Sequence, residues 1–213
     1  MEIIPREARR ITYSTEIRNL KKLDLNNIQK AVITGSILGD GYLEPNWSKT
    51  NYRLSIGHSI DQKSYVLWKY DIFKNLVLTK PRFKKVNSSF VFRTVSHPEI
   101  TRLRNIFYKN GKKIIPNNLF DHLSPLAIAV WFMDDGNLVK TGDKLKGFHL
   151  NTQSFSDEDN LKIKDLLSSI DINCSLERNK GRYRIGIWQK DSREMFIEII
   201  KDSIINSMRY KLG

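Results

Sequence analysis

Two aspartates that each precede a glycine are the residues of this chain best suited to bind divalent cations. Asp40 is the penultimate residue of the segment ITGSILGDG at 33–41, and Asp135 is the penultimate residue of the similar segment IAVWFMDDG at 128–136. The second aspartate follows the first by 95 residues in a chain of 213 residues. This spacing is typical of a duplicated half, and it predicts a two-carboxylate site near a pseudo-twofold axis.

Two such carboxylates can bind the divalent cations that hydrolyse a phosphodiester. Carboxylates that bridge hard divalent cations supply an activated water, charge relief on the phosphate and a stabilised leaving oxygen. A carboxylate at a helix C-terminus opposes the helix dipole, which favours a cation-binding role for Asp40 and Asp135. The alternative is that each aspartate only caps the turn before its glycine.

Both aspartates follow predicted helices. The first helix begins after Asn26 or Asn27, either of which can cap it, and ends near Gly39. The second begins at Ser124 and Pro125, a cap followed by a first-turn proline, and runs to the second Asp-Gly pair. The C-terminal ends of these two helices must therefore position the chemistry.

Small side chains mark one face of each of these helices. Ala31 and Gly35 lie four residues apart on the first helix, and Ala127 and Val130 occupy comparable places on the second. Small residues allow helix backbones to approach closely. We expect the two helices to pack against each other and to bring Asp40 and Asp135 together.

The segments after each helix alternate in polarity and contain turn residues, which predicts hairpins. In the first half we expect strands within 43–58 and 82–95, a helix at about 62–77, and a helix opened by Ser96 with a capping-box spacing to Glu99. In the second half we expect strands at about 138–152 and 173–188, a helix from Ser156 to about 169, and a helix from Asp191 to about Asn206. Each half is thus predicted to be helix–strand–strand–helix–strand–strand–helix.

These elements predict an α+β protein of two pseudo-symmetric halves joined by a central two-helix interface. We expect a basic N-terminal arm at 1–23, a first half at 24–121 and a second half at 122–213. With 40% hydrophobic residues the chain can bury a core across both halves.

The charge of the chain favours a nucleic-acid partner. Thirty-six Lys and Arg residues against 23 Asp and Glu leave a net charge of +13, which is typical of a phosphate-binding protein. Residues 80–113 are especially basic, with Glu99 as the single acidic residue. A generic basic protein, or one attracted to anionic membranes, is the alternative.

The predicted strands and their turns are rich in side chains that contact bases or phosphates. Arg and Lys can pair with guanine, and Asn and Gln with adenine, when a two-stranded ribbon lies in the major groove. An ordinary solvated sheet face is the alternative for each residue taken singly. The candidate DNA-binding residues are Asn46, Lys49, Asn51, Arg53, His58, Arg82, Lys84, Lys85, Asn87, Arg93, Asn137, Lys140, Lys144, Lys146, Asn151, Gln153, Arg178, Lys180, Arg182, Arg184 and Gln189.

Other classes of site fit the sequence poorly. The single cysteine, Cys174, excludes an intramolecular disulfide and a Cys/His zinc cluster, and the four histidines are too far apart in the sequence for a compact histidine-metal motif. The sequence has neither a Gly-rich phosphate loop nor an apolar stretch long enough for a membrane span. We expect a protein that is not secreted and that acts in an organelle matrix or stroma, or in a prokaryotic cytoplasm.

The two segments resemble the paired signature motifs of a LAGLIDADG homing endonuclease of the monomeric, double-motif type. Four blocks resemble the group I intron-encoded members: GKKIIPNNL at 111–119, WFMDDG at 131–136, LNTQSF at 150–155 and MRYKL at 208–212. The resemblance implies two αββαββα halves, central signature helices and a β-saddle that binds DNA.

The resemblance also implies roles for particular residues. Asp40 and Asp135 map to the metal-binding acids, with the preceding Gly39 and Asp134 as secondary metal candidates, and Lys113 and Lys211 map to the basic residues beside each metal site. Mg²⁺ is the implied cofactor, Mn²⁺ a substitute, and Ca²⁺ an ion that supports binding without cleavage. The implied activity is double-strand cleavage by a monomer at a long asymmetric DNA site, which promotes intron mobility.

Some residues depart from the family pattern. Ser36 and Leu38 stand where apolar and acidic residues are common, Met133 replaces an acid and Val130 replaces a glycine. These departures concern helix packing and leave both metal-binding aspartates in place. Two other functions stay open: an RNA maturase that assists splicing of a group I intron, and a DNA-binding regulator without catalysis.

Overall fold

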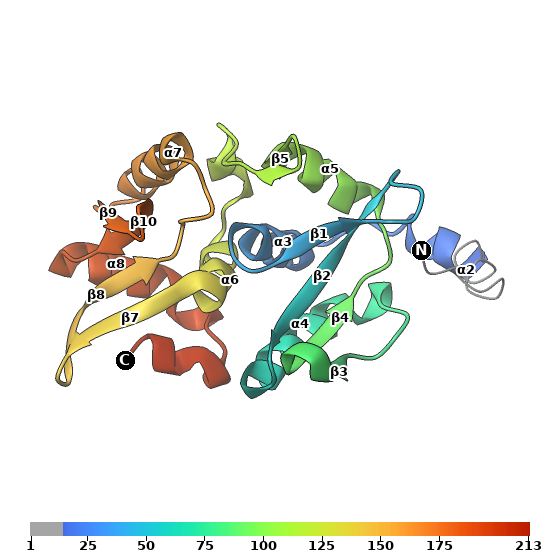
Figure 1. Cartoon of the computed structure of the whole chain (residues 1–213), viewed down its shortest axis with the longest axis horizontal. Helices are drawn as coiled ribbons and strands as arrows, with labels where there is room; N and C mark the ends of the chain where they lie inside the picture. Colours follow the sequence, from blue (N-terminus) through green and yellow to red (C-terminus); the bar gives the residue numbers. More distant parts are fainter. Residues whose placement is uncertain (1–14) are drawn as a thin grey trace.

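The structure consists of two similar halves on either side of a central pair of helices (Figure 1). This computed structural model describes residues 15–213, so the first fourteen residues of the predicted basic arm lie outside the described residues. The rest of the arm includes a short helix, α2 (Thr15–Leu20). No helix within residues 15–213 has the length and apolar character needed to cross a membrane.

The central pair consists of α3 (Asn27–Leu38) and α6 (Pro125–Asp135). Asn26 caps α3 because its side chain accepts a hydrogen bond from the backbone of Gln29, at 2.8 Å, while Gln29 caps Asn26 in return. Ser124 caps α6 by accepting from the Ala127 amide at 3.2 Å. The helices predicted before Asp40 and Asp135 are therefore confirmed, with Asn26 as the first cap.

The two central helices approach very closely at Gly35. A Cβ atom on Gly35 would lie 2.4 Å from the carbonyl oxygen of Ala127 and 2.7 Å from Cβ of Val130. Only glycine fits between these atoms without a shift of one helix. The predicted packing of the small-residue faces is confirmed, and it sets the separation of the two helix ends.

The two halves have the same topology. In the first half, α3 is followed by β1 (Tyr42–Pro45), β2 (Tyr52–Ser59), α4 (Lys63–Phe73), β3 (Arg82–Lys84), β4 (Ser89–Arg93) and α5 (Pro98–Phe107). In the second half, α6 is followed by β7 (Gly136–Thr141), β8 (Lys144–Leu150), α7 (Asp157–Ser168), β9 (Ser175–Asn179), β10 (Arg182–Ile187) and α8 (Lys190–Ile200). The antiparallel sheets have the matching orders β1-β2-β4-β3 and β7-β8-β10-β9, which confirms the predicted duplicated α+β fold.

Two predicted helix ends are wrong. The residue that caps α5 is His97, whose ring nitrogen accepts from the Glu99 amide at 3.2 Å, and not Ser96. Pro98 occupies the first helical position, so the extended residue immediately before it must be the cap. The last predicted helix ends at Ile200 instead of Asn206, because the chain becomes extended at the buried Ile204 and turns back into a 3-10 helix at Asn206–Lys211.

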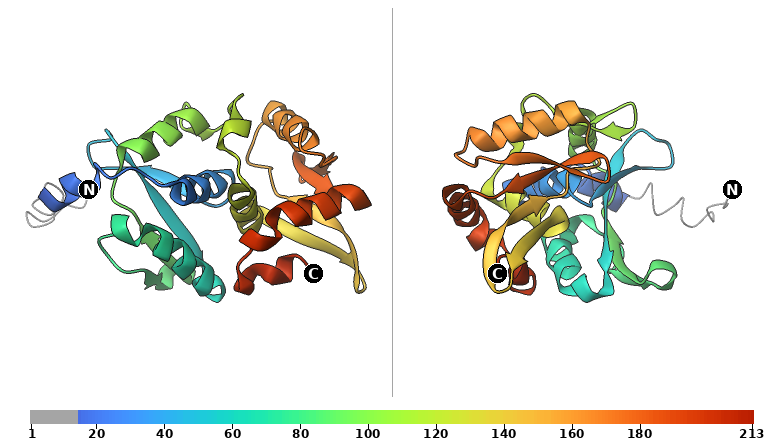
Figure 2. Two further views of the ribbon diagram at one scale, coloured as in Figure 1. Left: turned by 180° about the vertical axis from the view of Figure 1, so that it is seen from behind. Right: turned by 60° about the vertical axis from the view of Figure 1, so that its left-hand side comes forward.

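A single apolar core extends through both halves. Phe132 of α6 contacts the rings of Phe148 and Phe196, with centroids 5.5 and 5.2 Å away. The C-terminal 3-10 helix contacts both α4 and β7, so the end of the chain touches both halves at one edge of the molecule (Figure 2). A small hairpin of β5 (Tyr108–Lys109) and β6 (Lys112–Lys113) follows α5. The boundary predicted between residues 121 and 122 stays a prediction.

Candidate active site at the paired helix ends

The C-terminal ends of α3 and α6 bring Asp40 and Asp135 together. Asp135 is the last residue of α6, and Asp40 follows Gly39, which caps α3. Burial, and then the negative charges of Asp40 and Asp134, together raise the pKa of Asp135 to about 7, although Lys113 and Lys211 oppose the shift. Partial burial and the charge of Asp134 also raise the pKa of Asp40. The predicted pair thus forms a site in which the carboxylates repel each other, and a bound cation would relieve that repulsion.

Each predicted lysine lies at the helix end of its own half. Lys113 of β6 donates from Nζ to the Gly39 carbonyl oxygen at 2.6 Å, and Lys211 donates to the Met133 carbonyl oxygen at 2.5 Å. A cation there complements the negative end of the helix dipole. Burial lowers the pKa of both lysines, and the site aspartates oppose this shift. Both ammonium groups therefore lie beside the carboxylates.

Asn151, which the sequence assigns to DNA contact, supports Asp135. Its backbone amide donates to the Asp135 carbonyl oxygen at 3.0 Å, and its side-chain Nδ2 donates to the same oxygen at 2.7 Å. Nδ2 also lies 3.2 Å from Oδ1 of Asn137, another predicted DNA contact. The end of β8 therefore fixes the last residue of α6.

His58, also a predicted DNA contact, lies in the site. Its side chain is only 4% exposed, with Nδ1 3.9 Å from Asp40 and Nε2 3.6 Å from Asp134. Burial, and then the positive charge of Lys69, lower the pKa of His58 to about 4, although Asp134 opposes the shift. The ring is therefore neutral at pH 7.

Asp134 is bound by residues that the sequence reasoning missed. Lys69 of α4 places Nζ 2.8 and 3.1 Å from the two carboxylate oxygens, and the Tyr65 hydroxyl donates to Oδ1 at 2.7 Å. Internal donors thus occupy both oxygens of this secondary metal candidate. A signal for Lys69 was available, because it lies four residues after Tyr65 and four before Phe73, on the buried face of α4.

Asp40 and Asp135 suit a hard cation that takes its remaining ligands from water and a substrate. Within residues 15–213, no group of three or more His, Cys, Asp or Glu side chains is arranged to hold a metal ion. Magnesium commonly binds through one or two carboxylates and takes its other ligands from water and substrate phosphates. Asp40 and Asp135 fit this pattern, whereas the Gly39 carbonyl already accepts from Lys113.

The other predicted DNA-binding residues are distributed over the two sheets and their turns. Several are partly engaged within the protein. Among them, Arg53 pairs with Glu44 at 2.7 Å, Arg184 pairs with Glu177 at 3.4 Å, and Arg182 donates to the backbone of Gln153 at 3.3 Å. Asn46, Asn51 and Gln153 are half-buried. The exposed members are Lys49, Arg82, Lys84, Lys85, Asn87, Arg93, Lys140, Lys144, Lys146, Arg178, Lys180, Arg182 and Gln189.

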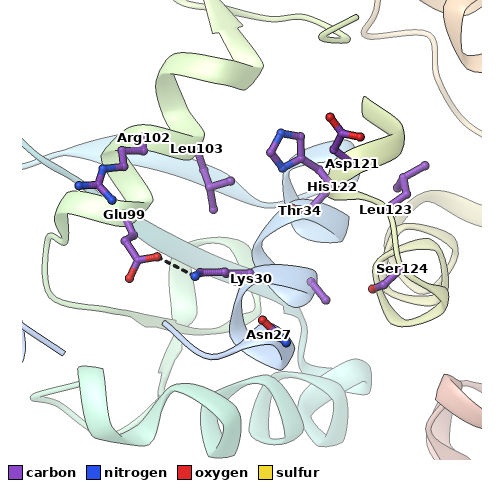
Figure 3. Close-up of a pocket in the computed structure, with 11 residues that line it drawn as sticks. Asn27, Lys30, Thr34, Glu99, Arg102, Leu103, Asp121, His122, Leu123 and Ser124 are labelled. Carbon is purple, nitrogen blue, oxygen red and sulfur yellow. Dashed lines mark ion pairs between the residues drawn. The ribbon is translucent and has the colours of Figure 1, made fainter. Parts of the chain in front are cut away.

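A pocket elsewhere in the molecule contains none of the predicted site residues. It lies among the first two turns of α3, helix α5 and the segment 121–124 before α6, with Lys30 and Glu99 paired at 3.0 Å on its wall (Figure 3). These are the N-terminal ends of α3 and α6, opposite to the ends that carry Asp40 and Asp135. The candidate site and this pocket therefore lie at opposite ends of the central helices.

Comparisons with known proteins agree with this geometry. A model of the LAGLIDADG DNA endonuclease family matches residues 30–195. The chain is 31% identical over 209 residues to the probable intron-encoded endonuclease 1 of Wickerhamomyces canadensis. The alignment covers 92% of this chain and 89% of that protein. The chain is also 27% identical over 218 residues to the cytochrome b mRNA maturase bI2 of Debaryomyces hansenii. That alignment covers 91% of this chain and 79% of that protein.

Among solved structures, the fold is similar to that of the homing endonuclease I-WcaI bound to its DNA recognition sequence. The TM-score is 0.85 at 28% sequence identity, with 100% of this chain and 96% of that chain covered.

Proposed function

This chain belongs to the LAGLIDADG DNA endonuclease family, and we propose on that basis that it is a site-specific endonuclease that cuts both strands of double-stranded DNA. The observation that carries the proposal is the meeting of Asp40 and Asp135 at the paired ends of α3 and α6, with one lysine from each half beside them. A turn-capping role for these aspartates would not require the lysines.

Asp40 and Asp135 are the residues that would hold divalent metal. When bound there, magnesium supplies charge neutralisation and a water activated for attack on phosphorus. The raised pKa values of the two carboxyls support this role, because burial and mutual repulsion disfavour their charged forms and a bound cation would offset both effects. Asp134 is left out of the proposed ligand set because Lys69 and Tyr65 occupy its carboxylate.

Lys113 and Lys211 are the proposed electrostatic catalysts. Each ammonium is anchored by a helix-end carbonyl, and in this proposal it stabilises the negative charge that develops on the phosphate during hydrolysis. Each half contributes one aspartate and one lysine, so one set of groups is available for each DNA strand.

The two sheets are the proposed DNA-binding surface. Their exposed Lys and Arg side chains supply phosphate contacts, and a net charge of +13 supplies long-range attraction. The strand residues of the two halves differ, with Arg82 and Lys84 on β3 but Glu177 and Arg178 on β9. A monomer with unlike halves should read an asymmetric site.

The test is selection from a large randomised duplex library, incubated in parallel with Mg²⁺ and with Ca²⁺. We expect one asymmetric family of sequences to be cut in Mg²⁺ and bound without cutting in Ca²⁺. Asp40→Asn and Asp135→Asn should each abolish double-strand cleavage while the Ca²⁺ pool still yields the same sequences. Cleavage that survives both substitutions would contradict the proposal.

A maturase function is the second candidate, and the similarity to the Debaryomyces hansenii maturase supports it. A basic sheet surface also suits RNA. The variant Asp40→Asn distinguishes the two functions. It should not cleave DNA, and it should still assist splicing only if the chain is a maturase. Selection of no DNA sequence by the unaltered chain would also favour this candidate.

A further inference from the structure

Lys69 is a fully buried lysine on helix α4 of the first half. Its side chain is 0% exposed, and its ammonium lies 3.0 Å from Ser36 Oγ as well as against the carboxylate of Asp134. Burying an ammonium is costly unless it is paired and hydrogen-bonded. A lysine retained in such a place therefore needs a reason beyond filling space.

The partner of Lys69 belongs to the other half of the molecule. Asp134 lies in the last turn of α6, immediately before Asp135, whereas Lys69 and Tyr65 lie on α4. Tyr65 places its hydroxyl 2.7 Å from Asp134 Oδ1 and 3.4 Å from the Val130 carbonyl oxygen, one helical turn earlier. Two side chains of the first half therefore hold the end of the helix that carries the second half's aspartate.

This arrangement exists on one side of the pseudo-twofold axis only. The residue equivalent to Asp134 in the first half is Gly39, and a Cβ atom on Gly39 would lie 2.4 Å from Cβ of Asp134. The space that an aspartate at position 39 would need is already filled by Asp134. The two aspartates of the site are thus supported differently: within residues 15–213, a buried ion pair holds the turn before Asp135, whereas Gly39 has no side chain to form one before Asp40.

We propose that Lys69 and Tyr65 are positioning residues for the cleavage reaction, which fix the last turn of α6 through Asp134 and so place Asp135. The inference rests on the proposed function, in which Asp135 holds metal. Other contacts to this turn, from Asn151 to the Asp135 carbonyl and from Lys211 to the Met133 carbonyl, come from the second half. Lys69 and Tyr65 add the link by which the first half sets the location of Asp135.

The geometry gives a reason for a large effect on rate. Reacting groups must be held within about 0.5 Å of the productive geometry, and a displacement of about 1 Å can cost about 100-fold in rate. Loss of the Asp134 contacts frees the turn that ends in Asp135, but it removes no group from the exposed sheets. Chemistry should therefore suffer more than DNA binding.

The experiment uses the full chain and its selected target duplex. For Lys69→Met, Tyr65→Phe and the double variant Lys69→Met/Asp134→Leu, the dissociation constant is measured in Ca²⁺ and the single-turnover cleavage rate in Mg²⁺. We expect Lys69→Met to slow cleavage about 10-fold or more and to change the dissociation constant by less than about 3-fold. Tyr65→Phe keeps the ion pair, so it should fold readily. It should also slow cleavage with little change in the dissociation constant, but by a smaller factor than Lys69→Met.

The double variant separates positioning from simple stabilisation. Replacing both members of a buried ion pair by apolar residues commonly restores stability, so its unfolding temperature should recover relative to Lys69→Met. Cleavage should stay slow, because the directional contacts to residue 134 are still absent. Recovery of the cleavage rate together with stability would overturn the inference.

Phe73→Leu is the matched control, since Phe73 is also fully buried on α4 and its apolar ring can neither pair with nor hydrogen-bond to the carboxylate of Asp134. It should lower stability without slowing cleavage more than it weakens DNA binding. If Lys69→Met or Tyr65→Phe behaves like this control, the positioning role is wrong while the endonuclease proposal stands. If the unaltered chain cuts no DNA, the proposed function fails and this inference fails with it.

Discussion

The carboxyl of Asp135 links the chemistry of the site to the stability of the metal-free chain. Burial and nearby carboxylates raise its pKa from the usual 3.8 to about 7 in the folded chain. A carboxyl that keeps its proton more tightly when folded stabilises the fold at low pH, and that contribution is lost as the pH rises from about 4 to about 7. In EDTA, Asp135→Asn should therefore be more stable than the unaltered chain at pH 8 by about 1 kcal/mol or more, or roughly 2–4 °C in Tm.

This stability difference should vanish near pH 3, where the unaltered carboxyl is protonated in the folded state and largely in the unfolded state. The measurement is chemical denaturation of both proteins across the pH range. A variant that is less stable than the unaltered chain at pH 8 would show that Asp135 has a structural role. Equal stability at every pH would show that its pKa is not raised.

The two lysines offer a second prediction at this scale. Lys113→Met and Lys211→Met each remove one ammonium from the site, and we expect each to slow cleavage about 10- to 100-fold. Because the halves are pseudo-symmetric, each variant should accumulate nicked duplex in which one strand is cut slowly. Strand-specific end-labelling measures this, and equal slowing of both strands in both variants would contradict the assignment of one lysine to each half.

The contact between α3 and α6 is the element on which both aspartates depend. Gly35→Ala would place a methyl group 2.4 Å from the Ala127 carbonyl oxygen, so the helices must separate. Overpacking of this kind costs about 1–3 kcal/mol, and we expect that loss in thermal denaturation together with slower cleavage. Ile28→Ala, at a 53% exposed position of α3, is the control and should change stability by about 0.5 kcal/mol or less. Unchanged stability in Gly35→Ala would mean that the helices do not touch there.

The central helices and their aspartates were predictable from sequence because their signals are local. The asparagine and serine caps, a first-turn proline and the terminal glycines all lie within one helix length. Ser96 was a wrong cap because Pro98 requires the cap at residue 97, which is also a local rule. The end of α8 was not predictable in this way, since it depends on burial of Ile204 against residues distant in sequence.

The parts of the site that the sequence did not indicate all join distant segments. Lys69 and Asp134 are 65 residues apart and meet only because α4 packs beneath the end of α6. His58 and Asn151 were placed among groove-reading residues on the basis of residue type, and their contacts with Asp134 and Asp135 depend on where β2 and β8 end. Residue type predicted polarity at these positions, whereas the fold determines what the polar groups contact.

The whole molecule carries a strong positive charge, so DNA affinity should depend steeply on salt. Between 50 and 200 mM salt, a protein with about 6–10 phosphate contacts loses about 10³- to 10⁵-fold in affinity. Binding in Ca²⁺ across a salt series should show this loss, and Lys84→Gln on β3 should reduce the log–log slope by about 1. Lys74→Gln, at an exposed site after α4 that pairs with Asp71, is the control. Equal slopes for both variants would remove β3 from the DNA surface.

The continuous core predicts that the two halves unfold together despite their separate sheets. Buried side chains of α3 and α6, among them Ile33 and Val130, belong to one apolar cluster with the cores of both sheets. Separation of the halves would expose this interface and leave Lys69 facing water without Asp134. We therefore expect coincident thermal transitions in tryptophan fluorescence and far-ultraviolet circular dichroism, since Trp68 lies in the first half and Trp188 in the second. Gly35→Ala should lower the midpoints of both transitions equally. Two separate transitions would mean that each half unfolds independently and that the contact between the central helices does not couple their stabilities.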